Sequence, residues 1–248
     1  MVLLGITLLV NSALPQLYGP TKLVQLVLVC GLCWHWRKLV PELTWKFHWS
    51  VVPVSIVLCA LWVMMRNGVN DLFGPDEAMT LPVWADRTTV SVVFFWSAAV
   101  GHLLTMVIAV PMIEEVFNRS VTLRCLHRPI QAFLGVMQIV LDFPVIGEWL
   151  MNTKMGDRLS NMPAVFGPEF ERNALGQLSL FGVTVSTAIF MAAHPVRDWP
   201  GALVCGVVWC LMLAWTKHKG LGPVIWSHAI TNALLWGYVM RTQDWQFM

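Results

Sequence analysis

Residues 89–113 read TVSVVFFWSAAVGHLLTMVIAVPMI, a run without Asp, Glu, Lys or Arg, and two glutamates follow it directly. A helix of about 20 apolar residues is long enough to cross the hydrocarbon core of a bilayer. The rest of the chain has the same character. Of its 248 residues 57% are hydrophobic and only 12% are charged, and the mean hydropathy is +0.65. Because a soluble domain carries roughly twice that charged fraction, the sequence predicts an integral membrane protein.

Further apolar blocks, separated by short charged segments, predict additional membrane-spanning helices. The expected spans cover residues 2–17, 21–36, 49–65, 89–113, 177–195, 200–216 and 220–240. An eighth apolar stretch, 130–150, is interrupted by Asp142, Pro144 and Glu148, so spanning, re-entrant and surface positions all stay open for it. We therefore expect an all-α polytopic membrane protein, a bundle of seven or eight transmembrane helices that forms a single domain over residues 1–248.

Two short basic segments orient the expected bundle. Segment 37–48 has three Lys or Arg and one acid, and segment 119–128 has three Arg and no acid. The positive-inside rule places both at the cytoplasmic face. The formal net charge of +2 is too small to indicate a nucleic-acid partner. The lipid bilayer is the expected surrounding, with the chain as a multi-pass protein of the cell membrane.

The first polar cluster at the end of an apolar block is Glu114-Glu115-Val-Phe-Asn-Arg119. Ionisable residues at membrane depth cost a few kcal/mol, so each is a candidate functional residue. On a helix Glu115 and Arg119 are four residues apart and can pair, whereas Glu114 points about 100° away. One carboxylate would then be neutralised, and the other would be free to act as a general acid or base. A solvated salt bridge at a helix end is the alternative, and this cluster alone leaves both open.

Two histidines form further clusters. Phe190-Met-Ala-Ala-His194 ends one apolar block, and His228-Ala-Ile-Thr-Asn232 lies within the last one. A single histidine near a helix end is more often a packed or interfacial residue than a catalyst, so the first pattern is weak by itself. Two polar side chains on one face of a membrane helix need polar partners, so the second pattern favours a functional site.

Together, the order Glu-Glu-x-x-x-Arg, Phe-x-x-x-His and His-x-x-x-Asn resembles the type II CAAX prenyl endopeptidase family, also called the CPBP or ABI family. The resemblance covers residues 88–240, which we expect to form the catalytic core. The stretch Ile225-Trp-Ser-His-Ala-Ile-Thr-Asn232 looks most similar to the branch associated with exosortase and PEP-CTERM sorting in bacteria. In one departure from the family motif, Ser120 follows Arg119 where glycine is usual. A long gap separates Arg119 from His194, but neither departure removes a candidate catalytic group.

The resemblance implies an intramembrane endopeptidase that cleaves near the C-terminus of membrane-anchored protein or peptide substrates. Glu114 and His194 would activate a water molecule for attack on the scissile carbonyl. His228 and Asn232 would donate hydrogen bonds to the developing oxyanion, a role worth about 3 kcal/mol for a good donor.

Three supporting residues and a metal-free site also follow from the resemblance. Glu115, held by Arg119, would orient the site, and Phe190 would pack beneath His194. No cofactor is expected. Two histidines and a glutamate are also a zinc ligand set, but the sequence lacks the helical zinc-protease motif H-E-x-x-H. Zinc is therefore the less favoured alternative.

Other functions and the cellular setting remain as expectations. A non-proteolytic membrane sorting or immunity accessory protein on the same scaffold is the main alternative to a protease. A small transporter would be favoured by broken helices in two corresponding halves, and no such internal symmetry is visible. The similarity to the exosortase-associated branch implies a bacterial inner membrane protein and an exosortase system as a possible partner.

Overall fold

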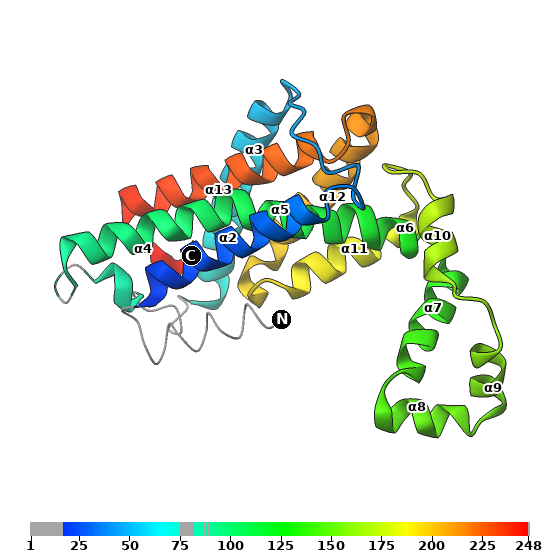
Figure 1. Cartoon of the computed structure of the whole chain (residues 1–248). Coiled ribbons are helices and arrows are strands. Elements are labelled where there is room, and N and C mark those ends of the chain that lie inside the picture. The colour runs from blue at the N-terminus through cyan, green and yellow to red at the C-terminus, as the bar shows by residue number, and fades with distance from the viewer. Residues whose placement is uncertain (1–16, 75–81, 87, 89, 248) are drawn as a thin grey trace.

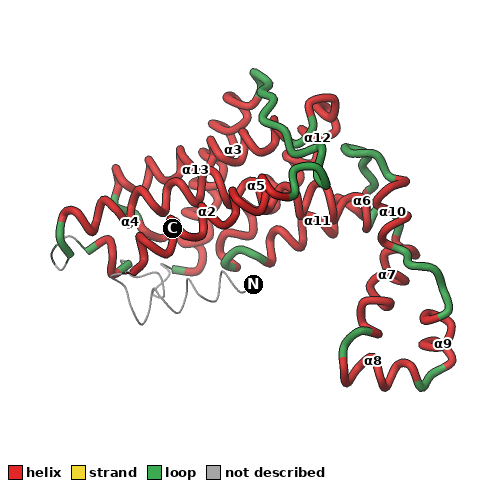
Figure 2. Tube along the Cα trace, in the orientation of Figure 1, coloured by secondary structure: helices red, strands yellow, loops and turns green. Residues whose placement is uncertain are grey.

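The computed structural model describes residues 17–74, 82–86, 88 and 90–247, and over these residues it is helical and contains no strand (Figure 2). The expected all-α fold class is confirmed. The first expected span, 2–17, lies almost wholly outside the described residues. The α-helices are α2 (Tyr18–His35), α3 (Val51–Phe73), α4 (Val92–Leu104), α5 (Val110–Glu115), α6 (Leu123–Cys125), α7 (Pro129–Leu141), α8 (Pro144–Met151), α9 (Lys154–Ser160), α10 (Phe166–Arg172), α11 (Leu180–Ala192), α12 (Trp199–Thr216) and α13 (Gly222–Thr242).

The decisive apolar run of the sequence forms one long helix, Val92–Cys125, of 34 residues. Ser91 caps its start, since the Ser91 side chain accepts a hydrogen bond from the Phe94 amide. Two π-helical segments, η3 (Thr105–Ala109) and η4 (Val116–Thr122), interrupt it on either side of α5. The helix ends shortly before Pro129, because the residue preceding a proline is pushed into extended backbone, as Arg128 is here.

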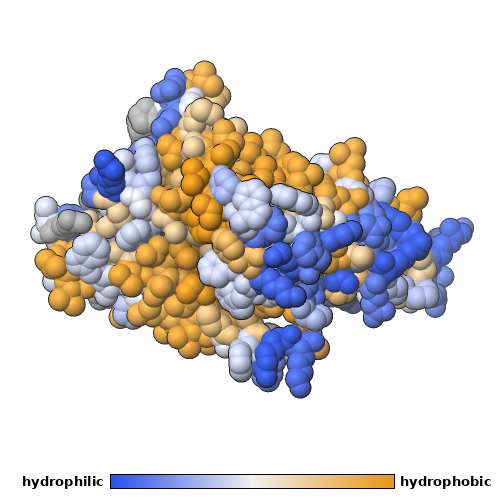
Figure 3. All heavy atoms as spheres, turned by 90° about the horizontal axis from the view of Figure 1, so that it is seen from above, coloured by the Kyte–Doolittle hydropathy of each residue, from blue (hydrophilic) through white to orange (hydrophobic). Residues whose placement is uncertain are grey.

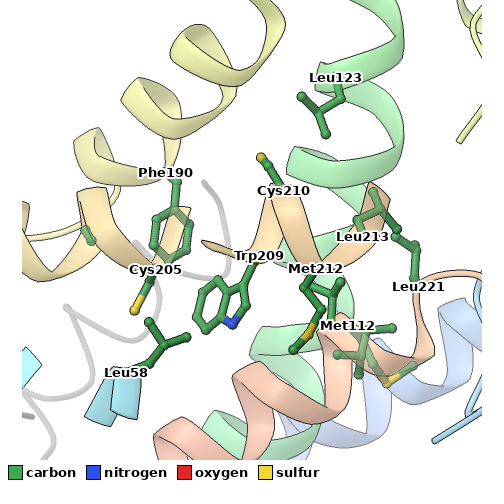
Figure 4. Packing of buried hydrophobic residues seen from close by; sticks show 13 residues of the cluster. Leu58, Met112, Leu123, Phe190, Cys205, Trp209, Cys210, Met212, Leu213 and Leu221 are labelled. Atoms are coloured by element: carbon green, nitrogen blue, oxygen red, sulfur yellow. The ribbon is translucent and has the colours of Figure 1, made fainter. Parts of the chain in front are cut away.

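The other long helices pack around this one. α2 lies against α4, α13 lies against α5 and η3, and α3 and α12 pack on α13 (Figure 1). Buried apolar side chains from these helices form the core, with Trp209 at its centre and Leu58, Phe190 and Cys205 around it (Figure 4). On the face seen in Figure 3, apolar residues cover much of the surface, and most hydrophilic residues gather toward one end. Such a surface suits a lipid environment.

The described helices do not confirm the expected number of seven or eight spans. Three are long and apolar enough to cross a membrane: Val51–Phe73, Val92–Cys125 and Val196–Lys219. The predicted spans 21–36 and 220–240 correspond to the helices α2 and α13, which fall outside this set. α13 has lower hydropathy because it carries the polar residues of the candidate site. α11 has 13 residues, about 20 Å at 1.5 Å per residue, which is shorter than a bilayer core of about 30 Å.

The ambiguous stretch 130–150 forms α7 and α8, which meet at an angle of 110°. Together with α9 they make an arm that projects from the end of the bundle (Figure 1). The sharp turns need glycine: a Cβ on Gly147 would collide with the Leu141 carbonyl, and one on Gly156 would collide with the Leu150 carbonyl. The arm is anchored by Arg128, whose Nε lies 3.0 Å from Oε2 of Glu169 on α10.

Candidate active site

Glu115 is the centre of the buried polar cluster. Its side chain is fully buried, and Arg119 Nε lies 3.3 Å from Glu115 Oε2 in the expected i, i+4 ion pair. The other oxygen, Oε1, lies 2.8 Å from His228 Nδ1, so this carboxylate joins the long helix to α13. Both oxygens of Glu115 are engaged, which leaves it suited to holding the site together.

Arg119 is held from several sides. Its Nη1 lies 3.3 Å from Ser186 Oγ on α11, and Ser186 in turn donates to the carbonyl of Asn118. The guanidinium also lies 5.4 Å from the ring centre of Phe190 and 5.9 Å from that of Trp209. Cation–π contacts of this kind help to hold a desolvated guanidinium. Phe190, predicted to support His194, thus contacts Arg119 as well.

His228 faces both glutamates. Because Glu115 accepts, Nδ1 of His228 carries the hydrogen of that bond, and the opposite ring nitrogen, Nε2, lies 3.9 Å from Glu114 Oε2. The indole of Trp209 is stacked on the imidazole at 4.2 Å between ring centres and 23° between planes. The ring is therefore fixed in position and tautomer, with Nε2 directed toward Glu114.

Glu114 is the less constrained of the two neighbouring carboxylates. Its side chain is 27% exposed, compared with 0% for Glu115. Within the described part of the chain, Oε2 of Glu114 is buried without a hydrogen bond, and its ion-pair partner, His228 Nε2, is 3.9 Å away. Oε2 of Glu115 also lacks a hydrogen bond, but it lies only 3.3 Å from Arg119 Nε. Buried polar atoms are rarely left unpaired, and an exception calls for an explanation. A carboxylate oxygen left free beside an imidazole is well placed to take a proton from a bound water.

The cluster can be electrically neutral. Two carboxylates, one guanidinium and one imidazolium carry no net charge when Glu114 is ionised and His228 is protonated. The balance also holds when Glu114 carries the proton and His228 is neutral. Neutrality matters here because an uncompensated charge at membrane depth is costly.

His194 follows the C-terminal end of α11. Its Nδ1 lies 2.8 Å from the carbonyl oxygen of Phe190, and since a carbonyl only accepts, Nδ1 carries the hydrogen. In the neutral ring Nε2 therefore has a free lone pair. The ring packs 4.6 Å from the Phe190 ring and 5.5 Å from the Trp62 ring, measured between centres. His194 also interacts electrostatically with Glu114.

A cavity of about 140 Å³ brings three of the predicted residues together, since His194, His228 and Asn232 all line it. This volume exceeds the 10–15 Å³ or so that one water needs. Glu114 is not among the lining residues, and its Oε2 lies 3.9 Å from Nε2 of His228. His228 therefore contacts both glutamates and also lines the cavity.

Asn232 connects the site to a π-helical segment. Its Nδ2 donates to the carbonyl of Met106, within η3, at 2.8 Å. A π-helical turn alters the regular backbone pairing, and such turns are frequent at functional sites. One of the two amide hydrogens of Asn232 is used in this contact, which leaves the other for a ligand. Pro111, which lacks an N–H, was a sequence sign that this helix would be irregular.

Sequence reasoning missed four residues of the site. Trp62, Trp209 and Asp198 line the cavity, and Ser186 contacts Arg119. Asp198 lies 3.3 Å from the buried Arg66 of α3. The two tryptophans and Ser186 lie in apolar blocks, where nothing separates them from ordinary packing residues. Only Asp198 could have been recognised from the sequence, because it is an acidic residue next to an apolar block.

Among the described residues, no group of three or more His, Cys, Asp or Glu is placed to hold a metal ion together. The nearest such set, Glu114, Glu115 and His228, is engaged internally, because His228 Nδ1 and Arg119 occupy Glu115. A direct metal-binding assay therefore tests the zinc alternative.

Comparison with protein families matches residues 95–234 to the model described as Type II CAAX prenyl endopeptidase Rce1-like. The match covers more than half of the chain, and the chain belongs to this family. The resemblance proposed from the motifs is thereby confirmed at the level of the family, while the exosortase-associated branch stays a prediction. No curated protein and no solved structure matches the chain.

Family membership has direct consequences. The family is one of proteases that act on membrane-anchored substrates in the lipid bilayer, and the apolar helices agree with a multi-pass membrane protein. All seven residues singled out from the sequence lie within the matched range. They are Glu114, Glu115, Arg119, Phe190, His194, His228 and Asn232.

Proposed function

We propose that this chain is a glutamate-dependent, metal-free intramembrane endopeptidase that cleaves near the C-terminus of membrane-anchored proteins. The observation that carries the proposal is the contrast between the two neighbouring glutamates. Glu115 is fully buried and lies close to charged partners through both oxygens, 3.3 Å from Arg119 Nε and 2.8 Å from His228 Nδ1. Glu114 is 27% exposed, and its Oε2 lies 3.9 Å from His228 Nε2, beyond hydrogen-bonding distance. A general base needs such a free carboxylate within reach of water.

In the first step Glu114, assisted by the free Nε2 lone pair of His194, takes a proton from water. The water oxygen bonds to the scissile carbonyl carbon, and the π electrons move to the carbonyl oxygen. The negative charge thereby passes from Glu114 to the oxyanion. The imidazolium of His228 and the second amide hydrogen of Asn232 donate to this oxyanion, each worth about 3 kcal/mol.

In the second step the carbonyl re-forms and the C–N bond breaks. The proton held by Glu114 passes to the leaving nitrogen, so that the products are a carboxylic acid and an amine and Glu114 is again ionised. The acid then gives its proton to the amine. Glu115 and Arg119 do not touch the substrate in this scheme. Arg119 holds Glu115, and Glu115 positions His228 and stabilises its positive charge, as the buried carboxylate of a catalytic triad does for its imidazole.

The substrate that fits this setting is a protein with a membrane-anchored C-terminal tail. The similarity of residues 225–232 to the exosortase-associated branch supports a sorting tail as substrate, an exosortase system as partner and a bacterial inner membrane as location. A non-proteolytic accessory role on the same scaffold is the competing proposal. It gives no physical reason for keeping a free carboxylate beside a fixed imidazole.

The test is cleavage of a panel of membrane-tethered C-terminal peptides by protein reconstituted in vesicles, with and without a chelator. The proposal expects product from the wild type in both conditions and none from Glu114→Gln. Arg172→Gln, an exposed change on α10, is the matched control and should cleave normally. Loss of wild-type activity under chelation would contradict the metal-free mechanism. Failure to cleave any peptide would favour the accessory role.

A further inference from the structure

A second feature lies on the outer face of the bundle, where an open groove of about 700 Å³ runs between α3 and α13. The two helices pack against each other (Figure 1), and residues of both line the groove. Its walls are almost wholly apolar and share no residue with the candidate active site. They include Cys59, Ala60 and Val63 of α3 and Ala233, Gly237 and Tyr238 of α13.

The groove exists because small side chains line it. Ala60, Ala233 and Gly237 leave space where larger residues would fill the junction. A Cβ placed on Gly237 would meet no atom within 4 Å. Because α3 is a candidate membrane span, this face is exposed to lipid, and lipid chains are the apolar material that surrounds it.

One end of the groove carries a positive charge. Arg241 lines it and is exposed, and no acidic or hydrogen-bonding partner of Arg241 occurs among the described residues. Tyr238 lies one turn before Arg241 and packs edge-on against Phe247 at 5.4 Å. Tyrosine and arginine near the end of a membrane helix lie at the depth of lipid headgroups.

The position along the helix agrees with this depth. α13 begins just after Lys217 and Lys219 and has 21 residues, about 31 Å at 1.5 Å per residue. Arg241 therefore lies at the membrane face opposite to those lysines. From Ala233 to Arg241 the groove follows about 12 Å of the helix, enough for the upper part of one acyl chain.

We infer that this groove binds an anionic phospholipid, with one acyl chain between α3 and α13 and the phosphate at Arg241. The apolar walls select a lipid chain, and the single cation selects a negative headgroup over a zwitterionic one. An isolated basic residue near anionic lipid favours binding by about fivefold. The site is independent of the proposed catalysis.

The test is native mass spectrometry of the full chain in detergent, titrated with phosphatidylglycerol or with phosphatidylcholine of the same acyl chains. The wild type is expected to hold one phosphatidylglycerol with about a fivefold preference. Gly237→Leu, which fills the groove, should abolish this tight binding for both lipids. Arg241→Gln should keep lipid binding and lose the preference.

Two matched variants serve as controls. Gly68→Leu adds a side chain to open space elsewhere on α3, and Arg172→Gln removes an exposed arginine on α10; both should bind as the wild type does. Equal phosphatidylglycerol binding by the wild type and Gly237→Leu would overturn the inference. An unchanged lipid preference in Arg241→Gln would also overturn it. A protein dimer that appears in place of the lipid adduct, and that Gly237→Leu disrupts, would assign the groove to a second copy of the chain.

Discussion

Glu114 and Glu115 are adjacent in sequence but have different surroundings in the fold. The helix turns Glu115 into the core, where Arg119 and His228 engage it, while Glu114 stays partly exposed, 3.9 Å from His228 Nε2. Breaking a buried ion pair by removing one partner is costly because the other charge is left uncompensated. The two residues should therefore differ in their effect on stability as well as on catalysis.

We predict that Glu115→Gln lowers the free energy of unfolding by about 3–5 kcal/mol, whereas Glu114→Gln changes it by less than about 1 kcal/mol. Thermal unfolding of the purified protein in detergent measures both. A larger loss of stability in Glu114→Gln than in Glu115→Gln would show that the structural and reactive roles are assigned the wrong way round.

Trp209 is a positioning residue for His228. Its indole is stacked on the imidazole at 4.2 Å, and its Nε1 donates to Ser227 Oγ at 3.1 Å. Trp209→Leu should lower kcat by about 10- to 100-fold, because a small displacement of a catalytic group has an effect of that size, while KM changes little. Trp209→Phe keeps a ring and should retain most of the activity.

Trp215→Leu is the matched control for Trp209, since Trp215 lies on the same helix and is 60% exposed. It should cleave at the wild-type rate. Equal losses in the Trp209 and Trp215 variants would indicate a general effect on α12 and would contradict the positioning role.

At the scale of the element, α10 connects the arm to the bundle through Glu169. A hydrogen bond from Arg128 holds the pKa of Glu169 below its ordinary value of 4.5, and Arg172 and Asn173 contribute in the same direction. A lowered carboxyl pKa stabilises the folded state above the unfolded value, and this contribution is lost as the pH falls through the folded pKa. The attachment of the arm should therefore weaken below about pH 4.5.

We predict that hydrogen exchange in α7–α10 speeds up as the pH falls below about 4.5, after correction for the intrinsic exchange rate. Arg128→Gln should exchange faster already at pH 7 and show a smaller pH-dependent step, because only Arg172 and Asn173 then lower the pKa of Glu169. Arg158→Gln, an exposed change on α9, should follow the wild type. A step of the same size in Arg128→Gln would mean that another group controls the attachment.

The sequence could predict contacts between residues close together in the chain, but not contacts between residues far apart. The Glu115–Arg119 pair was predictable because residues four apart share a helix face. The shared face of His228 and Asn232 followed in the same way. Other contacts join different helices, as between Ser186 and Arg119 and between Trp209 and His228. The helical periodicity of the sequence cannot predict such contacts. The 110° bend was also missed, although its interrupting residues were noted.

At the scale of the whole molecule, three basic segments meet at one end of the bundle. Glu42 of segment 37–48 lies 3.1 Å from Arg124, and Lys219 donates to the carbonyl of Phe47 at 2.9 Å. Segments 37–48 and 119–128, both expected at the cytoplasmic face, are thus neighbours in space. The site lies inside this end: His228 is about 9 Å along α13 and Glu114 about 17 Å along the long helix, at 1.5 Å per residue.

This arrangement predicts the side of the membrane on which α13 ends. The helix starts beside the basic end, so its C-terminal end should lie at the opposite face. In a bacterial host, alkaline phosphatase fused to the C-terminus should therefore be active, and a fluorescent protein fused at the same point should remain dark. The reverse pattern would place the basic segments outside, against the charge rule.

The central claim is that Glu114 supplies the carboxylate that activates water, and chemical rescue tests it most directly. Cleavage by Glu114→Ala would be measured in vesicles with increasing formate, beside Glu115→Ala as the matched variant. We predict that formate restores activity to Glu114→Ala in a dose-dependent manner, because this position is partly exposed. Formate should not restore activity to Glu115→Ala, because Glu115 is fully buried. Wild-type activity in Glu114→Ala without formate, or rescue of Glu115→Ala alone, would contradict it.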